Sequence, residues 1–213
     1  MRLVDLTLPI TECPPHDQEV TRSERKLRFG ESFYTAVEYT FRHTSMVGTY
    51  IDFPGHIRET DDGTDADTYP IDKLVDVKAA VIHLDRESGS GEVSAFELQA
   101  ASPVPAGCGA LILNALGSRR FDDIENRTVW LGLDAGEWII NTGVHLLVSD
   151  IYERTPELTG IFNDLFEAGI STVCWPINLH MLTTPYVRLT VLPLRFAGVT
   201  QLPCRVVARL DES

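Results

Sequence analysis

The chain has 213 residues, of which 44% are hydrophobic and 23% are charged, a balance typical of one globular domain spanning residues 1–213. Its net charge of −13, with no basic stripe to offset it, argues against nucleic-acid binding. No apolar run approaches the roughly 20 residues that span a bilayer. The first residues do not have the pattern of a signal peptide, so we expect a cytoplasmic protein without membrane contact.

The first half of the chain is predicted to be mostly β-structure. Residues 3–10 (LVDLTLPI) have the composition of a strand, and residues 34–44 (YTAVEYTFRHT) alternate apolar and polar side chains. Val37, Tyr39 and Phe41 fall on one side of this second segment, which predicts a half-buried strand. It leads directly into residues 45–57.

In the second half, apolar runs typical of strands alternate with two helical patterns. The strands are predicted at residues 78–84, 109–116, 144–150, 171–176, 187–196 and 204–210, and the weaker helix at 133–143. The stronger helix covers 155–170, with Thr155 as N-cap, Pro156 at the first helical position and Gly169 at the end. This alternation predicts a single mixed α/β domain.

The four cysteines are scattered and form no C-x-x-C pair. They are Cys13, Cys108, Cys174 and Cys204. Neither a cysteine-rich zinc site nor a disulfide framework fits this spacing, so reduced, buried thiols are expected.

Residues 45–57 read SMVGTYIDFPGHI and place Asp52 and His56 on either side of Pro54. This segment resembles the motif H-x-G-T-H-x-D-x-P-x-H of the cyclase family, the metal-dependent hydrolases that include bacterial kynurenine formamidase and isatin hydrolase. Further segments resemble the family in the same order, at residues 3–10, 145–150, 165–179 and 191–208. The resemblance implies a swivelling β/β/α fold with a mixed central sheet, assembled as a homodimer or homotetramer.

The metal-ligand positions of the family are largely replaced in this sequence. The two motif histidines correspond to Met46 and Tyr50, a later glutamate corresponds to Cys174, and a helix histidine falls near Phe162. The family uses zinc or manganese, and a catalytic zinc needs about three protein ligands plus an open position for water. We therefore expect the metal to be absent or weakly bound.

The retained residues suggest a metal-independent acid–base enzyme, that is, a cyclase, isomerase or hydrolase. Asp52 could hold His56 through a hydrogen bond, His56 could move a proton, and Tyr50 could donate to a developing oxyanion. The expected ligand is a small carbonyl-bearing or aromatic molecule. If the family fold holds, Met46, Trp175 and Cys174 are expected to line the substrate site.

Two alternatives stay open. Cys174 could act as a nucleophile together with His56 and Asp52, although a thiol inside the apolar segment STVCWP is expected to be buried and inert. The protein could also be a catalytically silent family member that binds a small molecule or serves in assembly, because apolar replacements remove the cost of an empty polar metal cavity.

Overall fold

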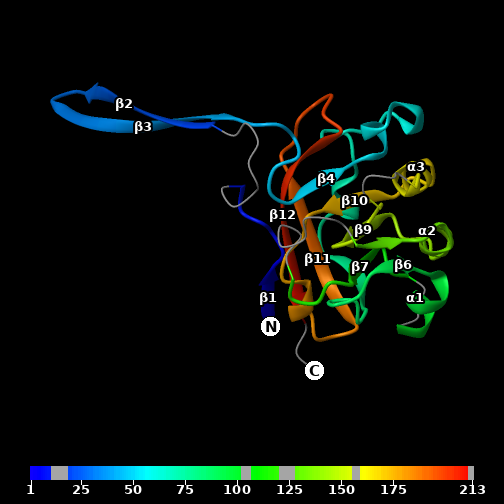
Figure 1. The fold of residues 1–213 in the computed structure, drawn as a ribbon. Helices are drawn as coiled ribbons and strands as arrows, with labels where there is room; N and C mark the ends of the chain where they lie inside the picture. Colours follow the sequence, from blue (N-terminus) through cyan, green and yellow to red (C-terminus); the bar gives the residue numbers. More distant parts are fainter. Residues whose placement is uncertain (11–18, 102–106, 120–127, 155–158, 211–213) are drawn as a thin grey trace.

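The computed structural model describes residues 1–10, 19–101, 107–119, 128–154 and 159–210. Its centre is a mixed sheet with the strand order β1-β12-β11-β5-β7-β9-β10-β4, in which β4 also pairs with β12. This second pairing closes seven strands into a barrel-like ring, and β1 is attached to β12 outside it (Figure 1). The prediction of a mixed α/β chain is confirmed.

The ring combines parallel and antiparallel pairing. Its strands are β4 (Tyr50–Asp52), β5 (Val77–His83), β7 (Ala110–Asn114), β9 (Leu146–Ser149), β10 (Ser171–Cys174), β11 (Tyr186–Pro193) and β12 (Gln201–Leu210), and β1 is Arg2–Asp5. Strands β5, β7, β9 and β10 run parallel to one another. Strand β4 runs antiparallel to both of its neighbours, β10 and β12.

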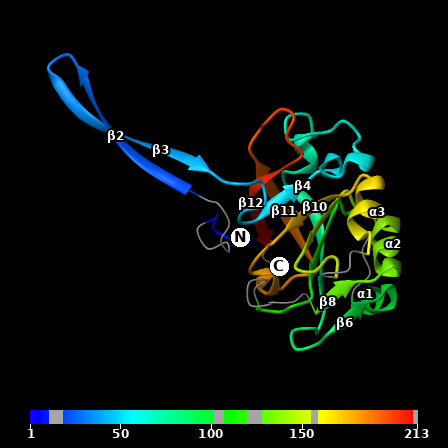
Figure 2. The same cartoon turned by 45° about the horizontal axis from the view of Figure 1, so that its top comes forward.

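Three α-helices in the described part of the chain cover one outer side of the ring (Figures 1 and 2). They are α1 (Ala95–Ala101), α2 (Leu133–Asn141) and α3 (Ile161–Glu167), next to a small sheet of β6 (Gly91–Val93) and β8 (Val129–Leu131). Short 3-10 helices are η2 (Pro54–His56), η3 (Arg58–Thr60), η4 (Ile71–Lys73) and η6 (Leu179–Met181). None of the described helices is long and apolar enough to cross a membrane.

Helix α2 and the end of α3 agree with the sequence patterns, whereas α1 was not predicted. Helix α3 starts only at Ile161, after Gly160 with a left-handed φ of 88°. Thr155 and Pro156, the predicted helix start, lie outside the described residues. Gly169, at φ 75°, follows the helix as expected for a C-terminal stop.

Two apolar cores lie on the two sides of the ring strands. Because successive side chains of a strand point to opposite faces, Ile51 and Val173 belong to the core inside the ring. Tyr50 and Cys174 instead belong to the core between the ring and the helices. The side chains that face the helices are therefore those that can form a site there.

Strands β2 (Glu19–Phe29) and β3 (Ser32–Arg42) form a two-stranded arm that projects from the body (Figures 1 and 2). Strand β3 confirms the predicted strand, but the prediction that one of its sides is buried is wrong for the single chain. Val37, Tyr39 and Phe41 are all exposed, because the described body does not cover this sheet.

Gly136 lets α3 approach α2 closely. A Cβ atom at this position would lie 2.8 Å from Cδ1 of Ile161, a fully buried side chain. We expect Gly136→Val to lower the free energy of unfolding by about 1–3 kcal/mol through overpacking. Thermal or denaturant unfolding measures this, with Glu137→Val at the next, exposed position as control. Equal stability of the two variants would contradict the prediction.

Candidate functional site

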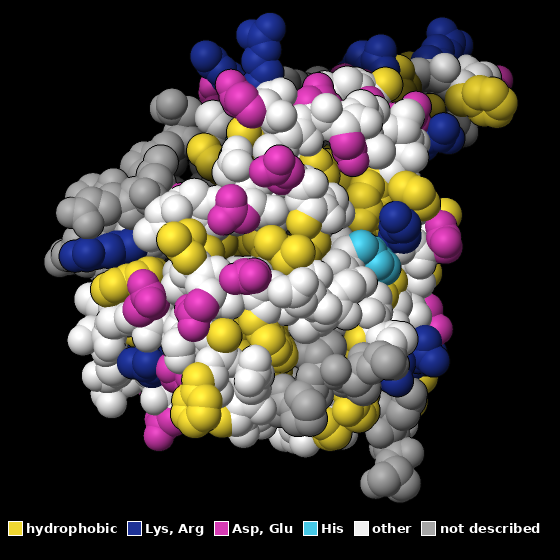
Figure 3. All heavy atoms as spheres, turned by 90° about the vertical axis from the view of Figure 1, so that its right-hand side faces the viewer, with side chains coloured by type: hydrophobic (Ala, Val, Ile, Leu, Met, Phe, Trp, Pro, Cys, Tyr) yellow, Lys and Arg dark blue, Asp and Glu magenta, His cyan; other side chains and the backbone are white. Residues whose placement is uncertain are grey.

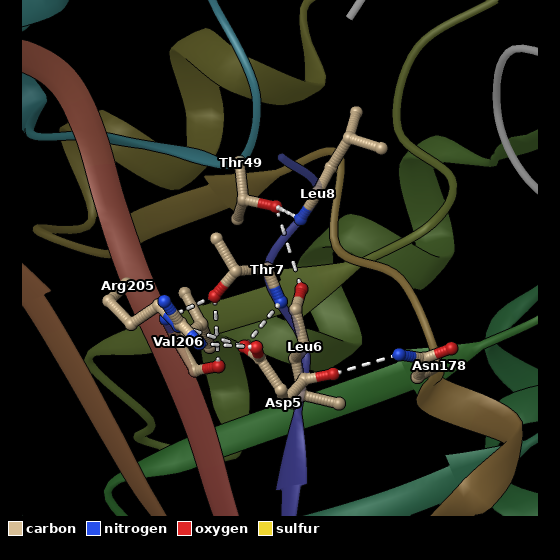
Figure 4. A network of polar contacts seen from close by, with 8 residues as sticks. All are labelled: Asp5, Leu6, Thr7, Leu8, Thr49, Asn178, Arg205 and Val206. Atoms are coloured by element: carbon tan, nitrogen blue, oxygen red, sulfur yellow. Dashed lines mark hydrogen bonds and ion pairs between the residues drawn. The ribbon is translucent and has the colours of Figure 1, made fainter. Parts of the chain in front are cut away.

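The segment that carries the motif is fixed to the body at Gly48 and Thr49. Gly48 has a φ of 61°, and a Cβ atom there would lie 2.7 Å from the carbonyl oxygen of Leu8. The Thr49 hydroxyl accepts the N–H of Leu8 at 2.8 Å and donates to the carbonyl of Trp175 at 2.7 Å. Figure 4 shows Thr49 above the chain segment that follows β1. The Gly-Thr pair therefore sets where β4 begins.

A polar network next to Thr49 ties β1 to β12 (Figure 4). Arg205 donates two hydrogen bonds to the Asp5 carboxylate, at 3.1 and 2.6 Å, and Thr7 exchanges hydrogen bonds with the backbone of Val206. Burial acts to raise the pKa of Asp5, but the hydrogen bonds from Thr7 and Arg205 outweigh it and lower the pKa. Asp5 thus stays ionised in its pair with Arg205.

Strand β4 places two polar side chains on the helix side of the ring. Tyr50 and Asp52 are two residues apart and so point to the same face. Asp52 pairs in register with Thr172 of β10 and Gln201 of β12, so three polar residues cross the sheet in one row. All three are buried.

A pocket of about 320 Å³ opens between this row and α3. Its lining consists of Met46, Tyr50, Asp52, His56, Ile57, Glu153, Gly160, Phe162, Asn163 and Gln201. The structure thus brings together Asp52, His56, Tyr50 and Met46, four of the residues selected from the sequence. Met46, a residue that is 49% exposed, contributes to the open side.

His56 is held by Gln201. Helix η2 begins with Pro54 and ends with His56, and this turn brings Nε2 of the imidazole within 3.2 Å of Nε2 of Gln201. The Ser45 hydroxyl donates to Oε1 of Gln201, so the amide nitrogen faces His56 and donates to it. In this arrangement the His56 ring proton is on Nδ1. The hydrogen bond expected between Asp52 and His56 is not formed.

Asp52 is buried, and hydrogen bonds within the protein do not fully replace those that its carboxyl group would make with water. Only 3% of the residue is exposed, Oδ2 accepts the Cys174 thiol at 3.5 Å, and Oδ1 has no hydrogen-bond partner. Burial raises the pKa of this carboxyl group, against the opposing effects of the Gln201 amide and of positive charge on His56. A carboxylate of raised basicity is a better proton acceptor near neutral pH.

Cys174 and Trp175 lie behind the lining residues rather than among them. Cys174 contacts Asp52 through its thiol, and the indole of Trp175 packs edge-on against Tyr50, with ring centroids 5.4 Å apart. Trp175 has a left-handed φ of 57°, which turns the chain sharply after β10. These two residues position Asp52 and Tyr50.

Helix α3 supplies an aromatic wall. Phe162, the position that the resemblance assigns near a family histidine, lines the pocket and stacks on Tyr152 with centroids 4.9 Å apart. Tyr152 is fully buried and donates to the carbonyl of Val173 at 2.8 Å. Burial first, and then the neighbouring acidic groups Cys174 and Asp52, raise the pKa of this phenol well above its usual value. It is therefore a neutral structural group.

Three polar lining residues, Glu153, Asn163 and Gln201, were not predicted from the sequence. Glu153 is buried, and its Oε1 accepts the N–H of Gly160 at 2.9 Å. It stands four residues beyond β9, where no local pattern in the sequence marked it. Gln201 lies within the C-terminal segment that resembles the family, two residues before Pro203, but only the register of β12 with β4 reveals its role.

The side chains that could act as metal ligands indicate whether the family's metal can bind in this pocket. Among the described residues, no three His, Cys, Asp or Glu side chains are grouped so that they could hold a metal ion. Asp52, His56 and Glu153 all line the pocket, together with Phe162 and with Met46, a thioether that is a weak ligand for zinc or manganese. In this geometry the described side chains do not form a three-ligand metal site.

Comparison with known proteins identifies the family. The family model described as "Putative cyclase" matches residues 4–153, more than two thirds of the chain. The chain belongs to this cyclase family, and the resemblance seen in the sequence is confirmed. A comparison with curated proteins finds no match.

Solved structures share the fold over nearly the full length. Isatin hydrolase A from Ralstonia solanacearum is 21% identical, with a TM-score of 0.72 over 97% of this chain and 91% of that one. A predicted metal-dependent hydrolase from Bacillus stearothermophilus is 18% identical, with a TM-score of 0.67 over 97% of each chain. A crystal structure of a cyclase is 14% identical, with a TM-score of 0.74 over 98% of this chain and 88% of that one.

The burial of Asp52 leads to a prediction about how the stability of the folded chain depends on pH. Because the pKa of Asp52 is raised in the folded chain, the folded state loses stability as the pH rises from the ordinary value of 3.8 through the raised pKa. Asp52→Asn removes this charge, so we expect it to stabilise the protein by about 1–3 kcal/mol at pH 7.5 and by less near pH 4.

Thermal unfolding of the wild type and Asp52→Asn at both pH values measures the effect. The exposed Asp85→Asn serves as the matched control and should change little. A variant that is less stable than the wild type at pH 7.5, or equally stabilised at both pH values, would show that the carboxylate is well compensated.

Proposed function

We propose that the protein is a metal-independent acid–base enzyme acting on a small carbonyl-bearing, aromatic substrate in the pocket between β4 and α3. The observation that carries the proposal is the placement of Asp52, His56 and Tyr50 around one cavity of about 320 Å³. In this proposal the family's metal centre is dismantled. The closed mixed ring with one helical layer supports the finer assignment to the swivelling β/β/α class.

The three side chains are given distinct roles. Asp52 acts as the general base, because its buried carboxyl group has a raised pKa and an oxygen that no protein group satisfies. His56, with its ring proton on Nδ1, and the phenol of Tyr50 serve as donors to a carbonyl oxygen that becomes negative. Gln201 and Ser45 keep the imidazole in this tautomer.

The size and lining of the pocket support a small aromatic substrate. Its volume lies at the lower end of the usual range for ligand pockets, about 300–1,000 Å³. Met46, Ile57 and Phe162 supply apolar walls for one or two fused rings. Isatin and N-formylkynurenine, which combine an aromatic ring with reactive carbonyl groups, are suitable first probes.

A catalytically silent binding protein is the second candidate. The Gln201 amide already engages Nε2 of His56, so this nitrogen is not available to take a proton from a bound molecule unless the amide moves. A pocket of this kind would still bind an aromatic ligand. The two candidates differ in turnover and not in binding.

Turnover of isatin and N-formylkynurenine tests the proposal directly. We expect a rate that is unchanged by EDTA and by added Mn²⁺ or Zn²⁺. Asp52→Asn and His56→Gln should each lower kcat by about 10²–10⁴-fold, because each removes a positioned proton donor or acceptor. Tyr50→Phe should cause a smaller loss.

Matched controls are Asp85→Asn and His180→Gln, two exposed residues outside this pocket. Activity that appears only after Mn²⁺ or Zn²⁺ is added would overturn the metal-independent mechanism. Binding of either probe without turnover by the wild type would favour the silent binding protein.

A further inference from the structure

The charged groups of the pocket are acidic. Asp52 and Glu153 both line it, and no Lys or Arg is among its lining residues in the described part of the chain. Both carboxyl groups are buried, so water screens them poorly. The chain has a net charge of −13, and Figure 3 shows acidic side chains spread over the side of the body that carries the helices.

The two carboxyl groups also have hydrogen-bond acceptor capacity that the protein does not use. Oδ1 of Asp52 is unpartnered, and Glu153 uses Oε1 for the single N–H of Gly160. Both groups of the Gln201 amide are already engaged, by Ser45 and by His56. A ligand that brings its own N–H donors therefore matches this lining better than one that brings carboxylate oxygens.

The apolar part of the lining is suited to an aromatic ring beside a cation. Phe162 and Tyr50 contribute ring systems, and Met46 and Ile57 contribute aliphatic surface. An ammonium group near the face of an aromatic ring gains further electrostatic stabilisation. An anionic ligand would meet two acids instead, with no described Lys or Arg in the lining to pair with it.

We propose that this pocket selects a small aromatic amine in its ammonium form over an aromatic carboxylate of the same size. The inference rests on the proposed function only in taking this pocket as the ligand site. Glu153 is the specificity-determining residue, and Asp52 contributes the second carboxyl group. The carbonyl that reacts and the ammonium group that is recognised are then two parts of one substrate.

Three indoles of similar size test the charge preference by isothermal titration calorimetry: tryptamine, its neutral analogue tryptophol, and indole-3-acetate. We expect tryptamine to bind about 10- to 100-fold more tightly than tryptophol, as for a hydrogen bond to a charged group, and indole-3-acetate to bind most weakly. Glu153→Gln should remove most of the tryptamine advantage and leave tryptophol affinity unchanged. The exposed Glu137→Gln is the control.

The possible outcomes distinguish a failure of the charge preference from a failure of the proposed ligand site. Equal affinity for tryptamine and tryptophol, or preference for indole-3-acetate, would overturn the charge preference while leaving the pocket as a ligand site. Failure of all three compounds to bind would count against both the preference and the proposed site. A tryptamine advantage retained in Glu153→Gln would overturn the role of Glu153.

Discussion

The pairing of one very short strand with two neighbours decides the architecture of this protein. Strand β4 has three residues, yet it pairs with β10 on one side and β12 on the other and so closes the ring. Without it the sheet would have two open edges, and Asp52 would lose the row that it shares with Thr172 and Gln201. The closure of the fold and the assembly of the pocket are therefore one event, and the Gly48–Thr49 anchor that sets the start of β4 serves both.

The pocket and the residues behind it combine several features that are unfavourable for folding. A carboxyl group is buried with one oxygen unsatisfied, a second carboxyl group is buried nearby, and a tryptophan adopts a left-handed backbone. Each feature is unfavourable by itself, and each touches the same cavity or the residues behind it. Such clustering is typical of functional sites. The two apolar cores on either side of the strands supply the stability that offsets these unfavourable features.

Much of the chain was predictable because its signals are local. Apolar alternation marked the ring strands, and the motif in residues 45–57 marked Asp52 and His56 as candidate site residues. Gln201 could not be found in this way, since its contact with His56 spans 145 residues and depends on the register of β12 against β4. Glu153 follows a strand without a motif. The exposed arm shows a further limit, because alternation predicts that a side is suited to burial but not which molecule buries it.

The ring also determines how freely the pocket can change. Positions 50 and 52 face the helices because of strand register, and position 162 lines the pocket from the helix side because of where α3 begins. The hydrogen bonds that fix this geometry belong to the backbone and to Thr49, so the pocket side chains can be exchanged without altering the frame. The same frame can therefore carry different side chains, which fits the shared fold of solved structures that are less than 25% identical to this chain.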